Sequence, residues 1–299
     1  METVTIGIAS LGRPSLVRTL QSLCSITVPA GLAIEIVVAD DDPGGGAAAR
    51  VESGAPWSVP VRVVAVGAGN ISSARNACLD AARGSLMAFV DDDEWVEPDW
   101  LVRLLAALDE FDAEVVIGPV FPVYPAGTPD WLVQANPLHV DWGRRGRKVD
   151  TGRSGNVLFR RARVERLGLR FDPALGKTGG EDTDFFHRLH RAGAVIVVTD
   201  DARIHEEAPA ARLAPAYLRL RAIRSGQSYA RFRLSGRRGL DAGGLGFHCD
   251  AAAKMLAGFL AASLLRPLSR ARSMAFAQKA WLNLGKLRQA TGRDLPSMY

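Results

Sequence analysis

Short apolar runs alternate with helical patterns along the first two hundred residues of the chain. The apolar runs are rich in β-branched side chains and end at turn or acidic residues, whereas the stretches between them carry apolar side chains every three or four positions. This alternation is typical of βαβ units, so we predict an α/β fold with a mostly parallel central sheet flanked by helices. The predicted strands are 4–9, 34–39, 61–66, 86–90, 114–118, 156–160 and 195–198. One predicted helix follows the first strand and ends at residue 23, and the others are 72–83, 100–108 and 185–192.

Two parts of the chain depart from this alternation. Residues 119–153 are rich in Pro, Gly, Trp and Arg without clear periodicity, and we interpret them as a long functional loop. The end of the chain predicts helices at 218–233, 251–265 and 273–288. The last of these mixes apolar residues and Trp with basic residues, which fits either an interfacial membrane helix or a helix packed on the protein. We therefore divide the chain into an α/β domain, residues 1–210, and a basic helical extension, residues 211–299.

Charge separates the same two parts. Residues 1–202 hold 20 Lys and Arg against 27 Asp and Glu, whereas residues 203–299 hold 17 against 5. A basic tail implies an anionic partner, which can be nucleic acid, a membrane surface or an acidic substrate. No nucleic-acid-binding motif accompanies the charge, so we expect no nucleic-acid partner and favour an anionic membrane surface.

Cysteine usage and hydropathy indicate the compartment. The three cysteines are far apart and form no Cys-x-x-Cys pair, which argues against a disulfide framework or a zinc ribbon and favours a reducing environment. The N-terminus does not predict a signal peptide. The longest apolar run, 255–265, is well short of the roughly 20 residues that span a bilayer. We expect a cytoplasmic protein, peripheral on the inner face of the cell membrane.

The acidic run Asp91-Asp92-Asp93-Glu94 directly follows the predicted strand 86–90. In open α/β sheets, ligands bind beyond the carboxyl ends of the strands. Mg²⁺ and Mn²⁺ prefer carboxylate oxygens together with phosphate oxygens of a substrate, and Asp91 and Asp93 are the outer pair that would supply them. The alternative is that these acids cap the following helix or face solvent. Consecutive acids repel one another, which favours a cation or a ligand.

A second acidic motif, Gly179-Gly180-Glu181-Asp182-Thr183-Asp184, precedes the predicted helix 185–192. A carboxylate in such a loop can act as a general base that deprotonates an attacking hydroxyl. The alternative is an acidic cap that stabilises the helix N-terminus through the helix dipole. Capping does not exclude catalysis, so Glu181 and Asp182 are candidate catalytic residues.

Taken in order, these motifs resemble those of the family 2 glycosyltransferases, which have the GT-A nucleotide-diphospho-sugar transferase fold. The resemblance covers about residues 4–206. Among subgroups the chain is most similar to bacterial exopolysaccharide enzymes of the succinoglycan ExoM type. The matching segments are TIGIAS at 5–10, VVAD at 37–40, NISSARNA at 70–77, FVDDDEW at 89–95 and GEDTD at 180–184.

The resemblance implies a role for each matched position. The segment 1–210 would be the catalytic domain, and Asp182 would be its base. Two features depart from the family: the second strand ends Asp40-Asp41-Asp42-Pro43 instead of Asp-Asp-Gly-Ser or Asp-Asn-Gly-Ser, and the Gln-x-x-Arg-Trp motif of processive synthases is absent. The implied donor-binding residues are Ala9, Ser10, Arg13, Asp40, Arg75, Asp91 and Asp92. The implied ligands of Mg²⁺ or Mn²⁺ are Asp93, Asp91 and His205. The alternative for His205 is that it is a packed or surface residue without a metal.

The implied reaction is an inverting transfer of a single sugar from a nucleotide-sugar donor to a glycan acceptor. We expect a UDP-sugar and a lipid-linked acceptor, in cell-surface or exopolysaccharide synthesis. The turn Ser10-Leu11-Gly12-Arg13-Pro14 lacks the glycine pattern of NAD-dependent oxidoreductases and excludes that class. The remaining alternatives are a sugar nucleotidyltransferase, whose Gly-rich basic signature is missing, and a non-catalytic protein that binds nucleic acid or membrane.

Overall fold

The computed structural model describes residues 2–234 and 242–289, which form two compact units. Residues 2–121 and 140–206 make up the first unit, and residues 122–139, 207–234 and 242–289 make up the second. Residues 122–139 thus group with the C-terminal helices, whereas the predicted division assigns them to the α/β domain. The segments 235–241 and 290–299 of the predicted extension lie outside the described residues.

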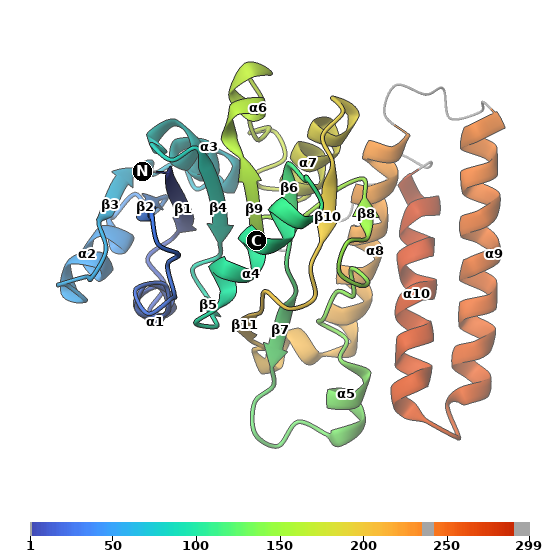
Figure 1. Ribbon diagram of the computed structural model, residues 1–299. Coiled ribbons are helices and arrows are strands. Elements are labelled where there is room, and N and C mark those ends of the chain that lie inside the picture. The colour runs from blue at the N-terminus through green and yellow to red at the C-terminus, as the bar shows by residue number, and fades with distance from the viewer. Residues whose placement is uncertain (1, 235–241, 290–299) are drawn as a thin grey trace. The chain divides into compact units, whose positions relative to one another are not determined.

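An eight-stranded sheet is the framework of the first unit (Figure 1). Strand β9 runs antiparallel to both of its neighbours, β4 and β6, and β8 runs antiparallel to β10. The other six strands share one direction, which confirms the predicted mostly parallel sheet. In spatial order the strands are β3 (Val61–Ala65), β2 (Leu32–Asp40), β1 (Glu2–Ser10), β4 (Leu86–Val90), β9 (Asn156–Arg160), β6 (Val115–Ile117), β10 (Ile196–Val198) and β8 (Lys148–Val149).

Helices cover both faces of this sheet, and each face has its own apolar core. In β1, Val4, Ile6 and Ile8 pack with the helices of one face. In β4, Met87 and Phe89 pack with those of the other. Strands buried on both faces read as continuous apolar runs, which is why the sequence reveals them. The first face is covered by α1 (Ser15–Leu23), α2 (Gly46–Ser53) and α4 (Trp100–Glu110), and the second by α3 (Ile71–Ala81), α6 (Arg161–Arg166) and α7 (Glu181–Arg191).

A three-stranded sheet comprises β5 (Glu94–Val96), β11 (Ile204–Glu207) and β7 (Val120–Val123) in spatial order. Strand β5 continues directly from the acidic run and pairs antiparallel with β11. The sequence pattern did not reveal these short strands. The prediction of one long loop over 119–153 is wrong in part, because that stretch contains β7, α5 (Asp130–Ala135) and β8.

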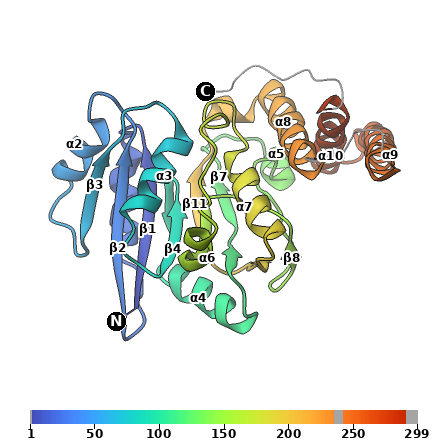
Figure 2. The ribbon, with the colours of Figure 1, turned by 90° about the horizontal axis from the view of Figure 1, so that it is seen from above.

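The second unit is helical. A 3₁₀ helix, η1 (Ala210–Leu213), precedes α8 (Pro215–Arg233), α9 (Ala242–Leu265) and α10 (Arg270–Gln289). Helix α10 lies between α8 and α9 in both views (Figures 1 and 2). Helix α10 also contacts α5, and Gln278 donates a hydrogen bond of 2.7 Å to the carbonyl of Pro137. Within residues 2–234 and 242–289, no helix is long and apolar enough to cross a bilayer.

Two glycines bring α8 and α10 into backbone contact. A Cβ atom on Gly285 would overlap the carbonyl oxygen of Ile223, and one on Gly226 would overlap that of Leu282. The overlapping atoms belong to the backbone, so no change of rotamer can relieve the clash. The close approach of these helices therefore depends on glycine at both positions.

We expect Gly285→Ala to lower the free energy of unfolding by roughly 1–3 kcal/mol, because the added methyl group must push α8 away. The matched control is Gly246→Ala in α9, where a new Cβ meets nothing within 4 Å. That substitution should be neutral or stabilise by up to about 1 kcal/mol, since alanine is the better helix former. Thermal unfolding followed by circular dichroism compares the two. Equal melting temperatures for Gly285→Ala and the unsubstituted protein would contradict the α8–α10 packing.

Candidate active site

The carboxyl ends of β1, β2 and β4 meet at one edge of the large sheet. Ser10 ends β1 and is paired in register with Asp40, which ends β2. Strand β4 adjoins β1 on its other side and ends at Val90, so Asp91 emerges at the same edge. The sheet thus brings the matched motifs of the first half together, at the edge where ligands bind in such folds.

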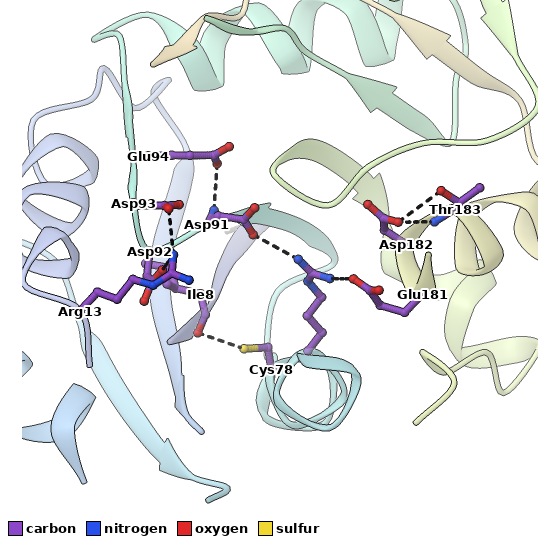
Figure 3. Close-up of polar contacts among 11 residues, drawn as sticks. Ile8, Arg13, Cys78, Asp91, Asp92, Asp93, Glu94, Glu181, Asp182 and Thr183 are labelled. Carbon is purple, nitrogen blue, oxygen red and sulfur yellow. Dashed lines mark hydrogen bonds and ion pairs between the residues drawn. The ribbon is translucent and has the colours of Figure 1, made fainter. Parts of the chain in front are cut away.

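Arg13 and Ser10 hold the aspartates that follow β4. The Ser10 hydroxyl donates a 2.6 Å hydrogen bond to Oδ2 of Asp92. The Arg13 guanidinium lies 3.3 Å from Oδ1 of Asp92 and 2.8 Å from Oδ2 of Asp93 (Figure 3). Ala9 is half-buried against the core on the α3 face of the sheet. The turn after β1 is therefore tied to the acidic run by charge-assisted hydrogen bonds.

Asp92 is buried, and burial raises its pKa to about 6. The Ser10 hydroxyl and Arg13 act against this shift, whereas the charges of Asp93 and Asp91 add to it. The carboxylate therefore carries a desolvation penalty that its two partners offset only in part.

Arg75 connects the two acidic motifs. Its guanidinium donates to Oε1 of Glu181 at 2.5 Å and to Oδ1 of Asp91 at 3.1 Å (Figure 3). The side chain is buried, and burial alone would lower the pKa of Arg75. The carboxylates of Asp91, Glu181 and Asp182 together raise that pKa above its ordinary value. Arg75 is thus a permanent cation between segments that lie ninety positions apart in the sequence.

The start of α3 positions the chain that leads to the second motif. Asn70 caps the helix by accepting from the backbone N–H groups of Ser72 and Ser73, and its amide donates to the carbonyl of Pro173. The Ser72 hydroxyl donates to the carbonyl of residue 172, and the Asn76 amide exchanges two hydrogen bonds with the backbone of residue 171. The segment Asn70-x-Ser72-x-x-Arg75-Asn76 therefore docks residues 171–173, a role that the sequence pattern alone did not reveal.

Two glycines precede α7 and set its entry. Gly179 and Gly180 have φ values of +83° and +95°, a region in which glycine meets no Cβ clash. Glu181, the first residue of α7, is buried, and burial raises its pKa, helped by the charge of Asp182 and opposed by Arg75. Asp182 is half-buried, and its Oδ1 accepts from the Thr183 backbone N–H at 2.6 Å. The two candidate catalytic carboxylates thus differ: Glu181 is engaged by Arg75, and Asp182 is the more accessible one.

Glu94 lies behind the aspartates as a buried acid. Its Oε2 accepts from the backbone N–H of Asp91 at 2.9 Å (Figure 3). Burial raises the pKa of Glu94 well above its usual value, and the charges of Asp91, Glu206 and Asp93 raise it further. Gly155 adjoins this group, because a Cβ there would lie 2.8 Å from Oε1 of Glu94. Sequence reasoning missed Glu206 and Gly155, since only the pairing of β5 with β11 sets Glu206 opposite Glu94.

The acids after β2 bind backbone N–H groups. Oδ2 of Asp40 accepts from Ala48 at 2.8 Å, and Asp41 accepts from the N–H groups of Ala68 and Asn70. Both carboxylates are buried. Asp40 therefore shapes the loops around the sheet edge, and its contact with a donor stays a prediction.

His205 lies on the opposite side of β11 from Glu206. Its imidazole stacks on Trp95 with ring centroids 5.6 Å apart, and its Nε2 is 3.0 Å from Oε1 of Glu97. Over the described residues, no group of three or more His, Cys, Asp or Glu side chains is arranged to hold a metal ion. A shared metal site of Asp91, Asp93 and His205 stays a prediction, and it would require His205 to leave Glu97.

Comparisons with known proteins agree on one family. The family model described as Glycosyl transferase family 2 matches residues 6–168. The chain is 40% identical to the succinoglycan biosynthesis protein ExoM of Rhizobium meliloti over 233 residues, which is 76% of this chain and 74% of that protein. It is 32% identical to the putative glycosyltransferase EpsH of Bacillus subtilis over 116 residues, 38% of this chain and 33% of that protein.

Solved structures show the same fold. A crystal structure of S. aureus TarS 1-349 has a TM-score of 0.54 at 19% identity and covers 98% of this chain and 92% of that one. A complex of TarS 1-349 with UDP-GlcNAc has a TM-score of 0.53 at 17% identity, with 98% and 93% covered. At these identities the likeness is one of fold.

The pKa of Asp92 predicts a pH-dependent stability. Because the folded protein takes up this proton near pH 6 and the unfolded chain near its ordinary 3.8, the unfolding free energy falls as the pH rises through that window. Asp92→Asn stays neutral, so its stability relative to the unsubstituted protein should be greater at about pH 7.5 than at about pH 4.5, by roughly 1–3 kcal/mol. Urea unfolding at both pH values, in chelator, measures the difference. If the unfolding free energies of Asp92→Asn and the unsubstituted protein differ by the same amount at both pH values, burial does not raise the pKa of Asp92.

Proposed function

The chain belongs to glycosyl transferase family 2, and we propose that it transfers a single sugar, with inversion, from a UDP-sugar to a glycan hydroxyl in exopolysaccharide synthesis. One observation carries the proposal: the Arg75 guanidinium contacts both Asp91, at the end of β4, and Glu181, beside Asp182. An inverting transfer needs a donor site and a base within one substrate length of each other. The contacts of Arg75 keep the two acidic motifs close together, which supports such an arrangement.

The relatives support the donor and the pathway. ExoM is named for succinoglycan biosynthesis, and TarS has been crystallised with UDP and with UDP-GlcNAc. In this chain, Ser10, Arg13 and Asp40 lie around the ends of β1 and β2, where the nucleoside of such a donor would bind. Ala9, the second-last residue of β1, would border the base.

Asp91 and Asp93 fit a divalent cation of the Mg²⁺ or Mn²⁺ type. Such ions take one or two carboxylates and complete their shell with water and substrate phosphates, so a full protein cage is not required. Arg13 contacts Asp93 and Arg75 contacts Asp91, which supports a site that attracts positive charge. The bound ion would act as a Lewis acid toward the leaving diphosphate. Asp91 and Asp93 would hold it, with His205 as the predicted third ligand.

Asp182 is the proposed general base. Its Oδ1 accepts from Thr183, and no donor among the described residues reaches its Oδ2. That oxygen would accept the proton of the acceptor hydroxyl as the hydroxyl oxygen bonds to the anomeric carbon and the diphosphate leaves from the opposite face. Glu181 would position α7 through its ion pair with Arg75.

We propose that the acceptor is a lipid-linked glycan at the inner face of the cell membrane. Polymers assembled from nucleotide-sugars on a lipid carrier bring their acceptor to a membrane surface. The basic second unit supports such a location, because anionic headgroups attract Lys and Arg.

We expect Asp182→Asn to lower turnover by about 10²–10⁴-fold while UDP affinity is unchanged, because the amide cannot accept the proton. The matched variant is Glu181→Gln, which keeps an oxygen that accepts from Arg75 and should lose much less activity. Turnover is measured as UDP released from UDP-glucose, UDP-galactose and UDP-GlcNAc in the presence of extracted lipid-linked glycans. If Glu181→Gln abolishes release and Asp182→Asn does not, the assignment of the base is reversed.

A thermal-shift series tests the donor and the metal. We expect UDP with Mn²⁺ to raise the melting temperature more than UDP alone, and more than GDP, dTDP, CMP or NAD, because ligands that bind only the folded state stabilise it. Asp93→Asn should abolish the effect of Mn²⁺, whereas Asp80→Asn, an exposed carboxylate on α3, should retain it. No shift with any nucleotide would overturn the proposed donor site.

A further inference from the structure

Helix α9 carries its small side chains inward and its large apolar side chains outward. Ala251, Gly258 and Ala262 are buried, and a Cβ on Gly258 would lie 3.0 Å from the Cβ of Ala280 on α10. On the other side of the helix, Leu256, Leu260 and Leu264 are 65%, 62% and 65% exposed. A helix that stabilises a water-soluble core has the reverse arrangement, with leucines inside.

The exposed side chains form one continuous stripe. They recur every three or four positions, so they lie on a single face of α9, and the stripe continues past the end of the helix to Leu268, which is 81% exposed. Exposed apolar patches of this extent mark interaction sites. We name this stripe the outer leucine face; it consists of Leu245, Cys249, Ala253, Leu256, Leu260, Leu264 and Leu268.

The positive charge around the outer leucine face favours an anionic partner. Residues 242–289 hold seven Lys and Arg and one acid, Asp250. Arg266, Arg270 and Arg272 are exposed and follow the carboxyl end of the stripe. A second copy of the chain, docked through the same face, would bring like charges together. An anionic lipid surface offers both apolar chains for the leucines and phosphates for the arginines.

We infer that α9 lies along an anionic bilayer, with the outer leucine face in the boundary between headgroups and acyl chains. The sequence pattern left open whether the helix 273–288 lies in a membrane interface or packs on the protein. In the structure, α10 packs against α8 and α9, and its Ala280, Asn283 and Gly285 are buried. This inference extends the proposed function and rests on it in one respect only, namely that the membrane is the one that carries the glycan acceptor. Lipid binding itself requires no sugar transfer.

Vesicle flotation of the full chain tests the inference, with phosphatidylcholine vesicles that contain or lack phosphatidylglycerol. We expect binding to the anionic vesicles only, and a loss of at least about tenfold in the triple variant L256S/L260S/L264S. The matched control, A257S/A261S, adds hydroxyl groups to the same helix outside the outer leucine face and removes no large side chain, so it should bind as the unsubstituted protein does.

Cys249 provides a second measurement that needs no leucine variant. It is exposed on the outer leucine face, whereas Cys78 is buried, so after Cys24→Ser a polarity-sensitive fluorophore can be attached at Cys249 alone. We expect its emission to shift to the blue when anionic vesicles are added. No shift, or no binding of the unsubstituted protein to these vesicles, would overturn the inference.

Two further outcomes separate this inference from its rivals. A dimer in light scattering that L256S/L260S/L264S dissociates, with vesicle binding unchanged, would assign the face to a second copy of the chain and refute the lipid surface. UDP binding by the triple variant distinguishes the two proposals. If the protein binds vesicles but no nucleotide shifts its melting temperature, the membrane face is supported and the proposed donor site is refuted. If UDP shifts the melting temperature but the protein does not bind vesicles, the donor site is supported and the membrane face is refuted.

Discussion

The site depends on the ion pairs of Arg75, of which the one with Glu181 is buried and the one with Asp91 is partly exposed. Without that cation, the buried Glu181 would be left without its counter-ion and would repel the nearby carboxylates of Asp91 and Asp182. Helix α3 can deliver Arg75 there because Asn70, Ser72 and Asn76 fix the chain before α7 to the same helix. One short helix thus determines both the charge and the geometry of the site.

Five acids lie close together around the end of β4. Asp91, Asp92, Asp93, Glu94 and Glu206 influence one another, and the pKa values of Asp92 and Glu94 are raised as a result of burial and of this crowding. Arg13 contacts Asp92 and Asp93, and Arg75 contacts Asp91. A divalent cation would stabilise such a partly buried cluster more than it would stabilise acids fully exposed to water. This crowding of acids links the structure to the metal-assisted transfer that we propose.

The helices of the second unit pack differently from those of the first. Its helices approach through Gly226, Gly285 and Gly258, so backbone contacts take the place of an interior filled with large side chains. Because small residues form the contacts between the helices, the leucines of α9 are not needed there and remain exposed. Close packing through small residues and an apolar outer face are features of helices that contact lipid. In this unit, the helix packing and the membrane association that we propose therefore use opposite sides of one helix.

The sequence by itself determined the α/β alternation and the positions of both acidic motifs. Strands such as β1 and β4 are buried on both faces, so each is a local apolar run, and the acids that follow them mark the ligand-binding edge. It could not reveal β5, β7 and β11, which are only three or four residues long, and so it missed Glu206 opposite Glu94. Nor could it show which face of α9 is covered, because an almost wholly apolar helix has no periodic signal. Only the tertiary structure decided these points, since contacts between distant segments depend on packing and not on local pattern.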